Sequence, residues 1–439
     1  MTTNYTQSTR NGLNPTQQLY KIVEDGMCIG CGICESIAGA HNISLEVVSN
    51  GFERPIIHDK LSEQHIDAIW ASCPGATVQG LPKKLVDNDT PKDLVWGPWR
   101  EMYYAYSAEP HIRHLASTGG VLTALALYLL ESKSVSFILH AKASETHPTF
   151  GEPTISRTRE DVLAAAGSRY GPTATLRAIG EVLYGAQSSN EKFAFIGTPC
   201  DVGTLRNYAK LDPRVDQYCD AMLTMVCGGF MSPAGLSAVF EQNGIEPKQV
   251  SAVRYRGNGC PGPTSVTTLD GKVTEISYLD LWGEDDAAWQ LPPRCKVCPD
   301  GIGEAADIAA SDVWEGGAPT QQEIDNDPGS NGAIVRSERG KEIMNAAIKT
   351  GYLVRGNDIT PEDMNRFQPH QEAKKRSVWA RYKGMKQAGK LVPDTKRLRL
   401  KKLAKQNTAE INDAQTAGSK LRAERGKFSE ATPVAIKRT

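Results

Sequence analysis

The residues best suited to chemistry are cysteines packed closely near the N-terminus. Cys28, Cys31 and Cys34 are separated by two residues each, and glycines occupy part of both spacers. Short glycine-containing spacers let three thiolates converge on one iron–sulfur cube. The next cysteine along the chain is Cys73, which a proline follows. The pattern therefore predicts a [4Fe–4S] cluster on Cys28, Cys31, Cys34 and Cys73. The alternatives are a zinc site, which usually shows paired C-x2-C units, or four unrelated thiols.

A second close pair, Cys295 and Cys298, lies near the middle of the second half of the chain. A zinc ribbon would need another such pair, which the sequence lacks. Cys200 and Cys227 each follow a short apolar run, so both are expected where strands of an α/β sheet end. We expect a second [4Fe–4S] cluster on Cys200, Cys227, Cys295 and Cys298. A redox-active or purely structural pair is the alternative, and Cys219 and Cys260 are predicted to be non-ligands.

Three loops have residues that suit a bound anion or ring. Ser117-Thr118-Gly119-Gly120 precedes an apolar helix, where capping side chains and glycines let an anion approach free amides. Gly167-Ser168-Arg169-Tyr170 offers a guanidinium for phosphate and a ring for stacking. Arg254-Tyr255-Arg256 places two guanidinia on one strand face. Asp312 is expected to orient an arginine, bind a cofactor hydroxyl or cap a strand. Each loop also has a plain interpretation, as an ordinary cap or surface loop.

Composition and charge limit the class of protein. The 439 residues are 40% hydrophobic and 23% charged, which fits a soluble globular protein of two or three domains. The N-terminus lacks an apolar signal region, and the run 121–130 is too short to span a bilayer, so we expect a cytoplasmic protein with no membrane span. Cysteines there are ligands or core thiols rather than disulfides.

The charge is unevenly distributed along the chain. The net charge is −1, but residues 371–439 contain nineteen Lys or Arg against six Asp or Glu. A basic tail can bind nucleic acid, an anionic partner or the acidic body of the same chain. Contact with the body, or a solvated helix, is the plainest interpretation, and nucleic acid is not expected.

The order of elements predicts three parts. Residues 20–95 combine the cysteine loop with a hairpin and a helix, as in half of a ferredoxin. Residues 96–365 alternate apolar strands with helices, which is typical of an α/β domain (α+β for the whole chain) with a mixed sheet. Residues 370–439 are predicted to form a basic helical tail.

The motifs together resemble the coenzyme F420 hydrogenase/dehydrogenase beta-subunit family. They are C-x2-C-G-x-C with a later C-P-G, S-T-G-G-V-L-T-A-L, G-S-R-Y, I-G-T-P-C, V-C-G-G-F, R-Y-R-G-N-G and C-x2-C-P-D before A-D-I-A-A-S-D. They cover about residues 20–360 in the family order. The family includes beta subunits of F420-reducing hydrogenase and formate dehydrogenase, 7-hydroxymethyl chlorophyll a reductase and ferredoxin-dependent 8-vinyl protochlorophyllide reductase.

The resemblance implies noncovalent FAD beside the [4Fe–4S] clusters, with residues 96–365 as the flavin-binding domain after a small ferredoxin-like one. It places these residues near the flavin: Thr118, Gly119, Gly120, Ser168, Arg169, Tyr170, Thr198 and Arg254. A chain with ligands for two clusters is more similar to the family members that reduce chlorophyll-type rings than to the hydrogenase subunits, which have one cluster. Cys260 and the tail after residue 370 depart from the family pattern.

The implied function is a flavin- and iron–sulfur-dependent oxidoreductase. A one-electron donor such as ferredoxin would dock near an exposed N-terminal cluster, and electrons would pass through both clusters to FAD and then as hydride to an organic substrate. One alternative is an electron-transfer beta subunit of a larger hydrogenase- or dehydrogenase-type complex that uses F420 or NAD(P)H. Another is a non-enzymatic cluster-binding interaction module. The sequence assigns no catalytic acid.

Overall fold

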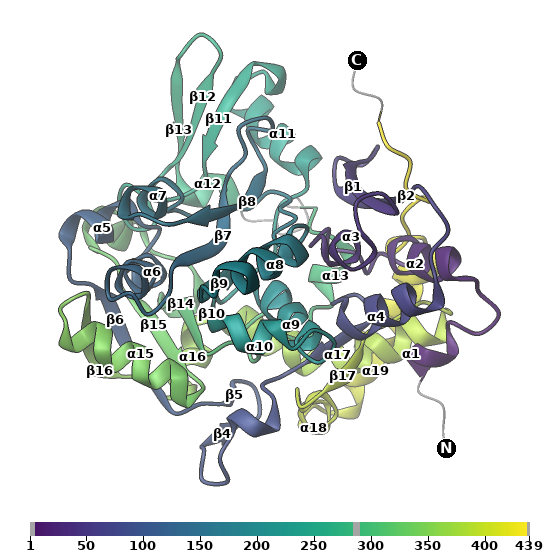
Figure 1. The fold of residues 1–439 in the computed structure, drawn as a ribbon. Helices are drawn as coiled ribbons and strands as arrows, with labels where there is room; N and C mark the ends of the chain where they lie inside the picture. Colours follow the sequence, from purple (N-terminus) through teal and green to yellow (C-terminus); the bar gives the residue numbers. More distant parts are fainter. Residues whose placement is uncertain (1–4, 284–289, 437–439) are drawn as a thin grey trace.

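The fold is mixed α/β and is built around one large mixed sheet (Figure 1). The computed structural model describes residues 5–283 and 290–436. The sheet has eight strands, in the spatial order β16 (Leu353–Asp358), β6 (Glu101–Ser107), β15 (Asn331–Val335), β14 (Ile308–Asp312), β10 (Cys219–Met225), β9 (Phe193–Gly197), β7 (Phe137–Ala143) and β8 (Gly151–Ser156). The four strands from β14 to β7 are parallel, and antiparallel strands complete both edges.

Helices cover both faces of the parallel centre. Phe193 and Phe195 of β9 pack against α8 (Ile179–Ser189) and α9 (Pro199–Tyr208). The alternate residues of the same strand face α6 (Val121–Glu131) and α15 (Glu338–Lys349). Because successive side chains of a strand point to opposite faces, a strand covered on both sides is apolar throughout, and every residue of β9 is buried.

Two smaller units adjoin this sheet. The antiparallel sheet of β11 (Val250–Arg254), β12 (Thr264–Thr268) and β13 (Val273–Ile276) packs on α11 (Pro233–Gln242) and projects from the body (Figure 1). The N-terminal segment contains α2 (Pro15–Glu24), α3 (Ile33–Ala38), the hairpin β1 (Ile43–Val47) and β2 (Glu53–Ile57), α4 (Glu63–Ser72) and β3 (Thr77–Gln79).

The remaining elements are short, and each is helical or a two-residue strand. They are α1 (Tyr5–Ser8), η1 (Lys83–Leu85), β4 (Lys92–Asp93), β5 (Gly97–Pro98), α5 (Pro110–Leu115), α7 (Arg159–Ala164), α10 (Arg214–Tyr218), η2 (Pro247–Gln249), α12 (Tyr278–Trp282), α13 (Pro293–Lys296), η3 (Glu315–Gly317), α14 (Gln321–Asn326) and α16 (Pro361–Phe367). In the described residues no helix has the length and apolar character needed to cross a membrane.

The basic tail is built into the N-terminal segment. It contains α17 (Pro369–Gln387), β17 (Asp394–Lys396), α18 (Leu400–Ala404) and α19 (Ala409–Glu424). β17 pairs in parallel with β3, and α17 and α19 lie beside α1 and α4 of the N-terminal segment in Figure 1. Tail side chains such as Met385 share a core with Ile66 and Trp70 of α4. The tail is therefore part of the folded body as well as a carrier of positive charge.

A buried ion cluster fastens the tail to the loop that precedes β14. Glu304 is fully buried, and its two carboxylate oxygens accept hydrogen bonds from Lys375 of α17 and from Arg399. A buried charge is tolerated only when it is paired and hydrogen-bonded, so these contacts fix the tail in one position.

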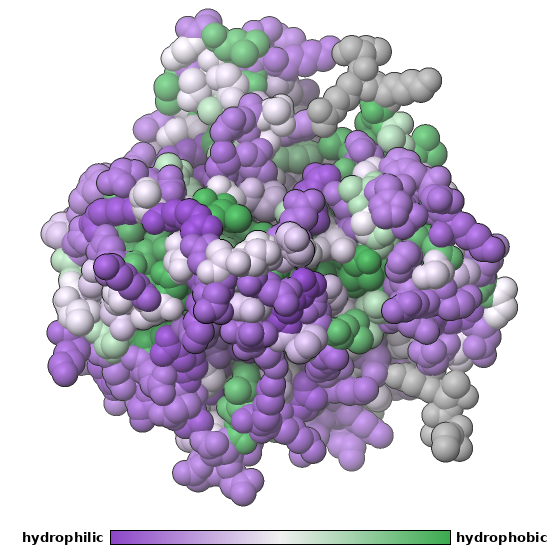
Figure 2. Space-filling view, viewed as in Figure 1, coloured by the Kyte–Doolittle hydropathy of each residue, from purple (hydrophilic) through white to green (hydrophobic). Residues whose placement is uncertain are grey.

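The outer surface is mostly hydrophilic on the face that Figure 2 shows, where apolar residues form small separate patches.

Candidate functional site

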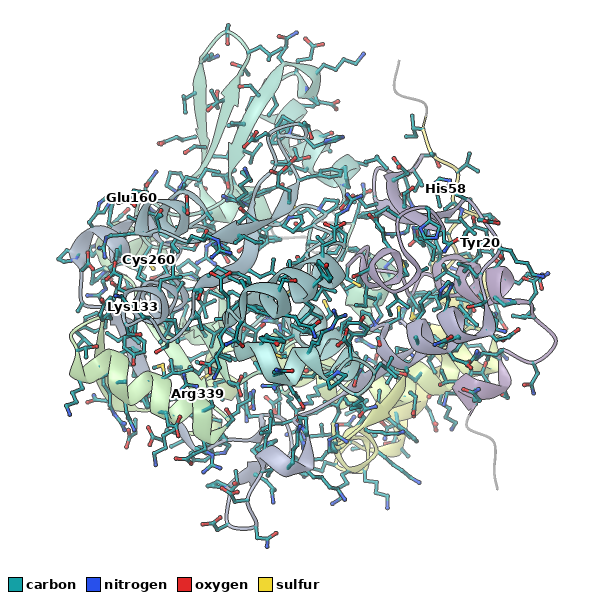
Figure 3. The ribbon with its side chains drawn as sticks, viewed as in Figure 1. Tyr20, His58, Lys133, Glu160, Cys260 and Arg339 are labelled. Atoms are coloured by element: carbon teal, nitrogen blue, oxygen red, sulfur yellow. The ribbon has the colours of Figure 1, made fainter. Side chains whose placement is uncertain are left out.

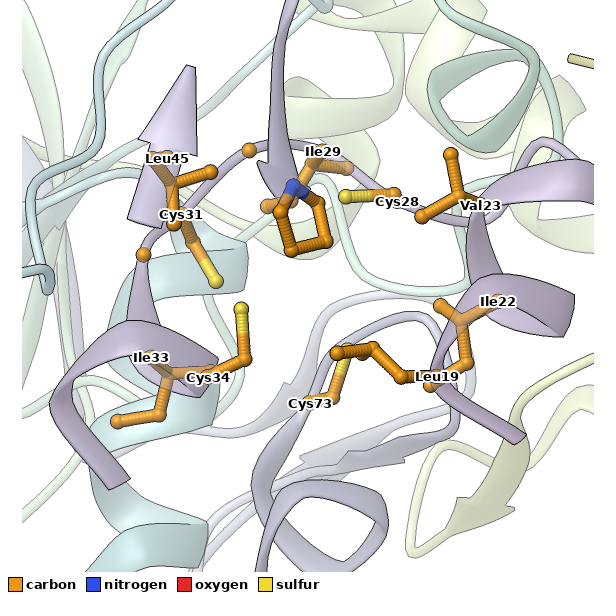
Figure 4. A pocket seen from close by; sticks show the side chains of 13 residues that line it. Leu19, Ile22, Val23, Cys28, Ile29, Cys31, Ile33, Cys34, Leu45 and Cys73 are labelled. Atoms are coloured by element: carbon orange, nitrogen blue, oxygen red, sulfur yellow. The ribbon is translucent and has the colours of Figure 1, made fainter. Parts of the chain in front are cut away.

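The four N-terminal cysteines surround one pocket, although they come from different elements. Cys28 and Cys31 lie in the loop before α3, Cys34 lies in α3, and Cys73 ends α4. Their sulfur atoms face a hollow that is otherwise lined by apolar side chains (Figure 4). Gly30 has a φ of +75°, and a Cβ there would stand 2.8 Å from the carbonyl oxygen of Glu53. The glycine therefore lets the loop wrap this closely, as the sequence predicted.

The electrostatics of this pocket suit thiolates that are bound to a positively charged metal core. Burial, together with the charge of the neighbouring Cys28, raises the pKa of the Cys73 thiol to about 12. Burial likewise holds the pKa values of Cys31 and Cys34 well above the ordinary value. Thiols in such a place ionise only when a bound metal supplies positive charge. The donor set therefore fits an iron–sulfur cluster better than it fits free reactive thiols.

The spacing of these side chains differs from that of a site for one ion. In the described part of the chain, no group of three or more His, Cys, Asp or Glu side chains is arranged to hold a metal ion. Ligands of one zinc ion must each reach about 2.3 Å from a common centre. A four-iron cube is bound at its corners, so its thiolates stand farther apart.

The second set of cysteines also gathers in space. Cys200 lies in the first turn of α9, Cys227 follows β10, Cys295 lies in α13, and Cys298 follows it. Burial is the largest of the causes that raise the pKa of Cys227 to about 11 and that of Cys295 to about 12, and the charge of the nearby Cys298 contributes to both. Cys200 in turn lies close enough to Cys227 and Cys298 for their charges to raise its pKa. All four residues are partly exposed as a whole.

The two sets are adjacent. Arg294, directly before Cys295, is buried and donates a hydrogen bond from Nε to the carbonyl oxygen of Pro74, directly after Cys73, at 3.0 Å. Arg54 is near Cys28 of the first set and Cys295 of the second, because both raise its pKa against the effect of burial. Two guanidinia therefore stand between the two groups of thiols. Positive charge there stabilises an added electron on either side.

Helix α17 of the tail holds the backbone around the second set. Gln371 donates a hydrogen bond to the carbonyl oxygen of Cys227 at 2.7 Å, and the Tyr382 hydroxyl donates to that of Val297 at 3.0 Å. Lys374 lies near both Cys227 and Cys295, whose pKa values it lowers against the larger effect of burial. The sequence did not connect the tail with this site. The positive charge of the tail was the only feature of the sequence that could have indicated this contact.

The loops expected to bind a cofactor meet at the carboxyl end of the sheet. The backbone N–H of Ser168 donates to Ser117 Oγ at 2.9 Å, which joins the loop 167–170 to the loop 117–120. Arg256 forms an ion pair with Asp312 at 2.9 Å, and Thr118 donates to the same carboxylate at 3.0 Å. Asp312 therefore orients an arginine, which was one of its expected roles.

Arg169 and Arg254 form an unusual pair in this group. Both guanidinia lie over Gly167, where a Cβ would stand 3.6 Å from each. Burial lowers the pKa of both residues, and the charge of Arg254 lowers that of Arg169 further. Both Nε atoms are buried and have no hydrogen-bond partner in the described residues. Each guanidinium donates to one backbone carbonyl oxygen, Arg169 to that of Ser168 and Arg254 to that of Leu115. Two partly buried like charges with unpaired Nε donors fit an anionic group, such as the pyrophosphate of FAD.

The other residues that the resemblance places near the flavin make different kinds of contact. Tyr170 packs its ring edge-on against Tyr255 and Trp282, with centroids 5.6 and 4.7 Å away. A Cβ on Gly119 would stand 2.8 Å from the backbone nitrogen of Asn331, so this glycine serves close packing against β15. Thr198 caps α9, and its Oγ1 lies 3.0 Å from Cys200 Sγ, which places it at the second cysteine set.

The sequence analysis did not predict some of the contacts around the candidate cofactor site. Asn331 donates to Thr118 Oγ1 at 3.1 Å, and the Arg256 guanidinium lies 5.1 Å over the Tyr278 ring and 5.3 Å over the Trp314 ring. No spacing rule links these positions, because they come from separate strands and from a helix. Gly120 begins α6 in the left-handed conformation.

The two cysteines predicted to be non-ligands lie elsewhere. Cys260 lies on the side of the molecule away from the N-terminal segment that contains Tyr20 and His58 (Figure 3). Its charged neighbours are Asp327 and Arg256, among others, rather than thiols. Cys219 is buried at the start of β10.

Comparison with known proteins identifies the family. Residues 102–180 match the model for the N-terminal part of the coenzyme F420 hydrogenase/dehydrogenase beta subunit, and residues 190–359 match the model for its C-terminal part. The chain belongs to this family. The resemblance drawn from its motifs is therefore confirmed, and the matched regions contain every loop of the candidate cofactor site.

Relatives in the family are named as oxidoreductases of different kinds. The chain is 28% identical to F420-dependent formate dehydrogenase 1 subunit beta of Methanococcus maripaludis over 58% of this chain and 60% of that protein. It is 25% identical to coenzyme F420 hydrogenase subunit beta of Methanococcus voltae over 61% and 89%. It is 20% identical to the chloroplastic 7-hydroxymethyl chlorophyll a reductase of Oryza sativa over 72% and 60%. The match thus spans less than two thirds of the first and third relatives.

A solved structure is also similar to the chain. A chain from the xenon-derivatized F420-reducing [NiFe] hydrogenase complex of Methanosarcina barkeri is 23% identical, with a TM-score of 0.48, over 66% of this chain and 96% of that chain.

Proposed function

We propose that this oxidoreductase family member passes electrons from a one-electron donor, such as ferredoxin, through two [4Fe–4S] clusters to FAD and then as hydride to an organic substrate. The observation that carries the proposal is the contact of Arg294 with Pro74, which joins two sets of four cysteines. In this proposal the N-terminal segment is a ferredoxin-like domain and the large sheet carries the flavin.

The residues have distinct roles in this proposal. Cys28, Cys31, Cys34 and Cys73 hold one cluster, and Cys200, Cys227, Cys295 and Cys298 hold the other. Arg169 and Arg254 bind the cofactor phosphates, while Asp312 and Thr118 fix the position of Arg256. When bound, the clusters carry single electrons, and FAD stores two and delivers hydride. The aromatic side chains around Tyr170 exclude water from this region.

The ligand assignment predicts the result of a single substitution. Cys295→Ser is expected to lower the iron content from about eight to about four per chain, because each cube needs its four thiolates. The N-terminal cluster should keep its electron paramagnetic resonance signal after reduction. Cys219→Ser is the matched control and should keep all the iron. Unchanged iron in Cys295→Ser would refute the second ligand set.

The position of Lys374 predicts a change of reduction potential. Lys374→Gln removes a positive charge beside Cys227 and Cys295, and this charge favours the reduced, more negative cluster. We expect the midpoint potential of the second cluster to fall by about 59 mV, which is tenfold in a one-electron equilibrium. Lys374→Arg should keep the wild-type value in the same spectroscopic titration. A fall of the same size in Lys374→Arg would mean that shape rather than charge is responsible.

A second candidate function is an electron-transfer beta subunit of a larger complex that uses F420 or NAD(P)H. It is favoured by relatives that are named as beta subunits of formate dehydrogenase and of hydrogenase. Affinity purification under anaerobic conditions separates the two candidates. A stable, stoichiometric large partner supports the subunit role, and a chain that reduces an organic substrate alone supports the reductase role. A non-enzymatic module would not need the paired arginines.

A further inference from the structure

One face of α17 forms an open groove that none of the roles above uses. The groove is lined by Trp379, Tyr382, Lys383, Lys386 and Gln387 and has a volume of about 350 Å³. These residues recur at spacings of three and four, so they share one side of the helix. The opposite side of α17 packs on α19, where Gly384 lies against the backbone of Thr416.

The groove is positively charged, and Lys383 is exposed. The Lys386 ammonium lies 4.9 Å over the ring of Tyr5, and burial lowers its pKa more than the nearby charge of Asp394 raises it. None of the ion pairs in the described part of the chain includes Lys383, Lys386 or Lys401, although neighbouring tail residues form several. Lys401 lies with its ammonium 6.0 Å over the ring of Trp379, which is 38% exposed. An exposed indole is common in protein interfaces, and the positive charge around it is complementary to an acidic partner.

The floor of the groove touches the second set of cysteines. Tyr382 lines the groove, and its hydroxyl donates to the carbonyl oxygen of Val297, between Cys295 and Cys298. All four cysteine residues of the second set are partly exposed, whereas in the first set only Cys28 is. The backbone of the second set therefore lies nearer the surface than that of the first. This differs from the sequence-based expectation that a donor would meet an exposed N-terminal cluster.

We propose that the groove on α17 is the docking site of an acidic one-electron carrier protein, which delivers electrons at the second four-cysteine site. The proposal rests on the proposed function and adds where electrons enter. In the transfer the carrier loses one electron and the second site gains it, and no bond or proton is exchanged. The acidic surface of the carrier pairs with Lys383 and Lys386, and the indole of Trp379 supplies apolar contact.

A charge-reversal variant tests this. Lys383→Glu with Lys386→Glu is compared with wild type for anaerobic reduction by a pre-reduced, acidic plant-type [2Fe–2S] ferredoxin in a stopped-flow instrument. We expect the second-order rate constant to fall at least tenfold at low salt. The wild-type rate should also fall as salt rises, whereas the rate of the variant should change little. Lys383→Gln with Lys386→Gln should give an intermediate rate.

The matched control reverses two exposed lysines elsewhere, Lys133 and Lys349, both to Glu. Figure 3 shows Lys133 on the other side of the molecule from the N-terminal segment. This control has the same net charge as the test variant, and its rate should stay within twofold of wild type. Equal slowing in test and control, or no slowing in either, would overturn the proposal, because net charge or another surface would then govern docking.

Two further measurements, with a small-molecule electron donor and with other anionic probes, separate loss of docking from other causes of slow reduction. Reduced methyl viologen needs no docking site, so it should reduce the wild type and both variants at similar rates. Wild-type protein that neither donor reduces would overturn the proposed function as well as the docking site. Phosphatidylserine vesicles and a DNA duplex are the other anionic probes. Loss of their binding in the test variant, with ferredoxin kinetics unchanged, would assign the groove to them and overturn the proposal.

Discussion

Replacing Arg169 and Arg254 together by methionine is expected to abolish flavin retention while leaving the apoprotein at least as stable as wild type. Both guanidinia lie beside Gly167, burial lowers both pKa values, and both Nε atoms lack a partner in the described residues. Hydrogen bonds to a charged group contribute about 1.5–3 kcal/mol each, so losing two weakens FAD binding at least about 100-fold. Removing two unpaired charges relieves repulsion in the empty site.

Two measurements check this prediction, namely FAD affinity by fluorescence and chemical unfolding of the apoprotein. Arg157→Met is the matched control, because Arg157 forms an ion pair with Glu191 at 2.8 Å on the surface. That control should keep wild-type FAD affinity. A double variant that binds FAD normally, or whose apoprotein is greatly destabilised, would show that the arginine pair is structural and binds no anion.

Lys375→Met is expected to lower the free energy of unfolding by about 3–5 kcal/mol, the cost of leaving a buried charge without its partner. Glu304 is fully buried and depends on Lys375 and Arg399 for its hydrogen bonds. The same change should loosen α17, whose contacts hold the backbone of the second cysteine set. Denaturant unfolding measures the loss, and proteolysis should cut the tail sooner.

The control for this prediction is Lys420→Met. Lys420 pairs with Glu424 at 3.7 Å, and both side chains are about half exposed. Such pairs contribute less than about 1 kcal/mol. A loss below about 1 kcal/mol in Lys375→Met as well would mean that water or Arg399 alone satisfies Glu304, and that the tail is attached less firmly than its contacts indicate.

Features that depend on short segments of sequence were predicted correctly. The alternation of apolar strands with helices predicted the α/β fold, and the cysteines at strand ends were brought together because parallel strands share one carboxyl edge. Asp312 was recognised at such an edge, and it meets Arg256 there. These successes share one cause, which is that each depends on a strand end or a short spacing visible in one segment.

Long-range contacts could not be predicted in the same way. The pairing of β17 with β3, and of Glu430 with Arg54, joins residues more than three hundred positions apart. No periodicity in the tail indicates which surface covers it, so its place in the N-terminal core was not foreseen. The position of Thr198 beside Cys200 likewise depends on the cap of α9 rather than on any cofactor motif.

The central claim is that eight thiols of one chain hold two clusters beside a bound flavin. The most direct test is purification with oxygen excluded, followed by iron, sulfide and flavin counts on the intact chain. The account predicts about eight iron, about eight sulfide and about one FAD per chain. About four iron would contradict the second site, and a colourless preparation without iron or flavin would contradict the whole account.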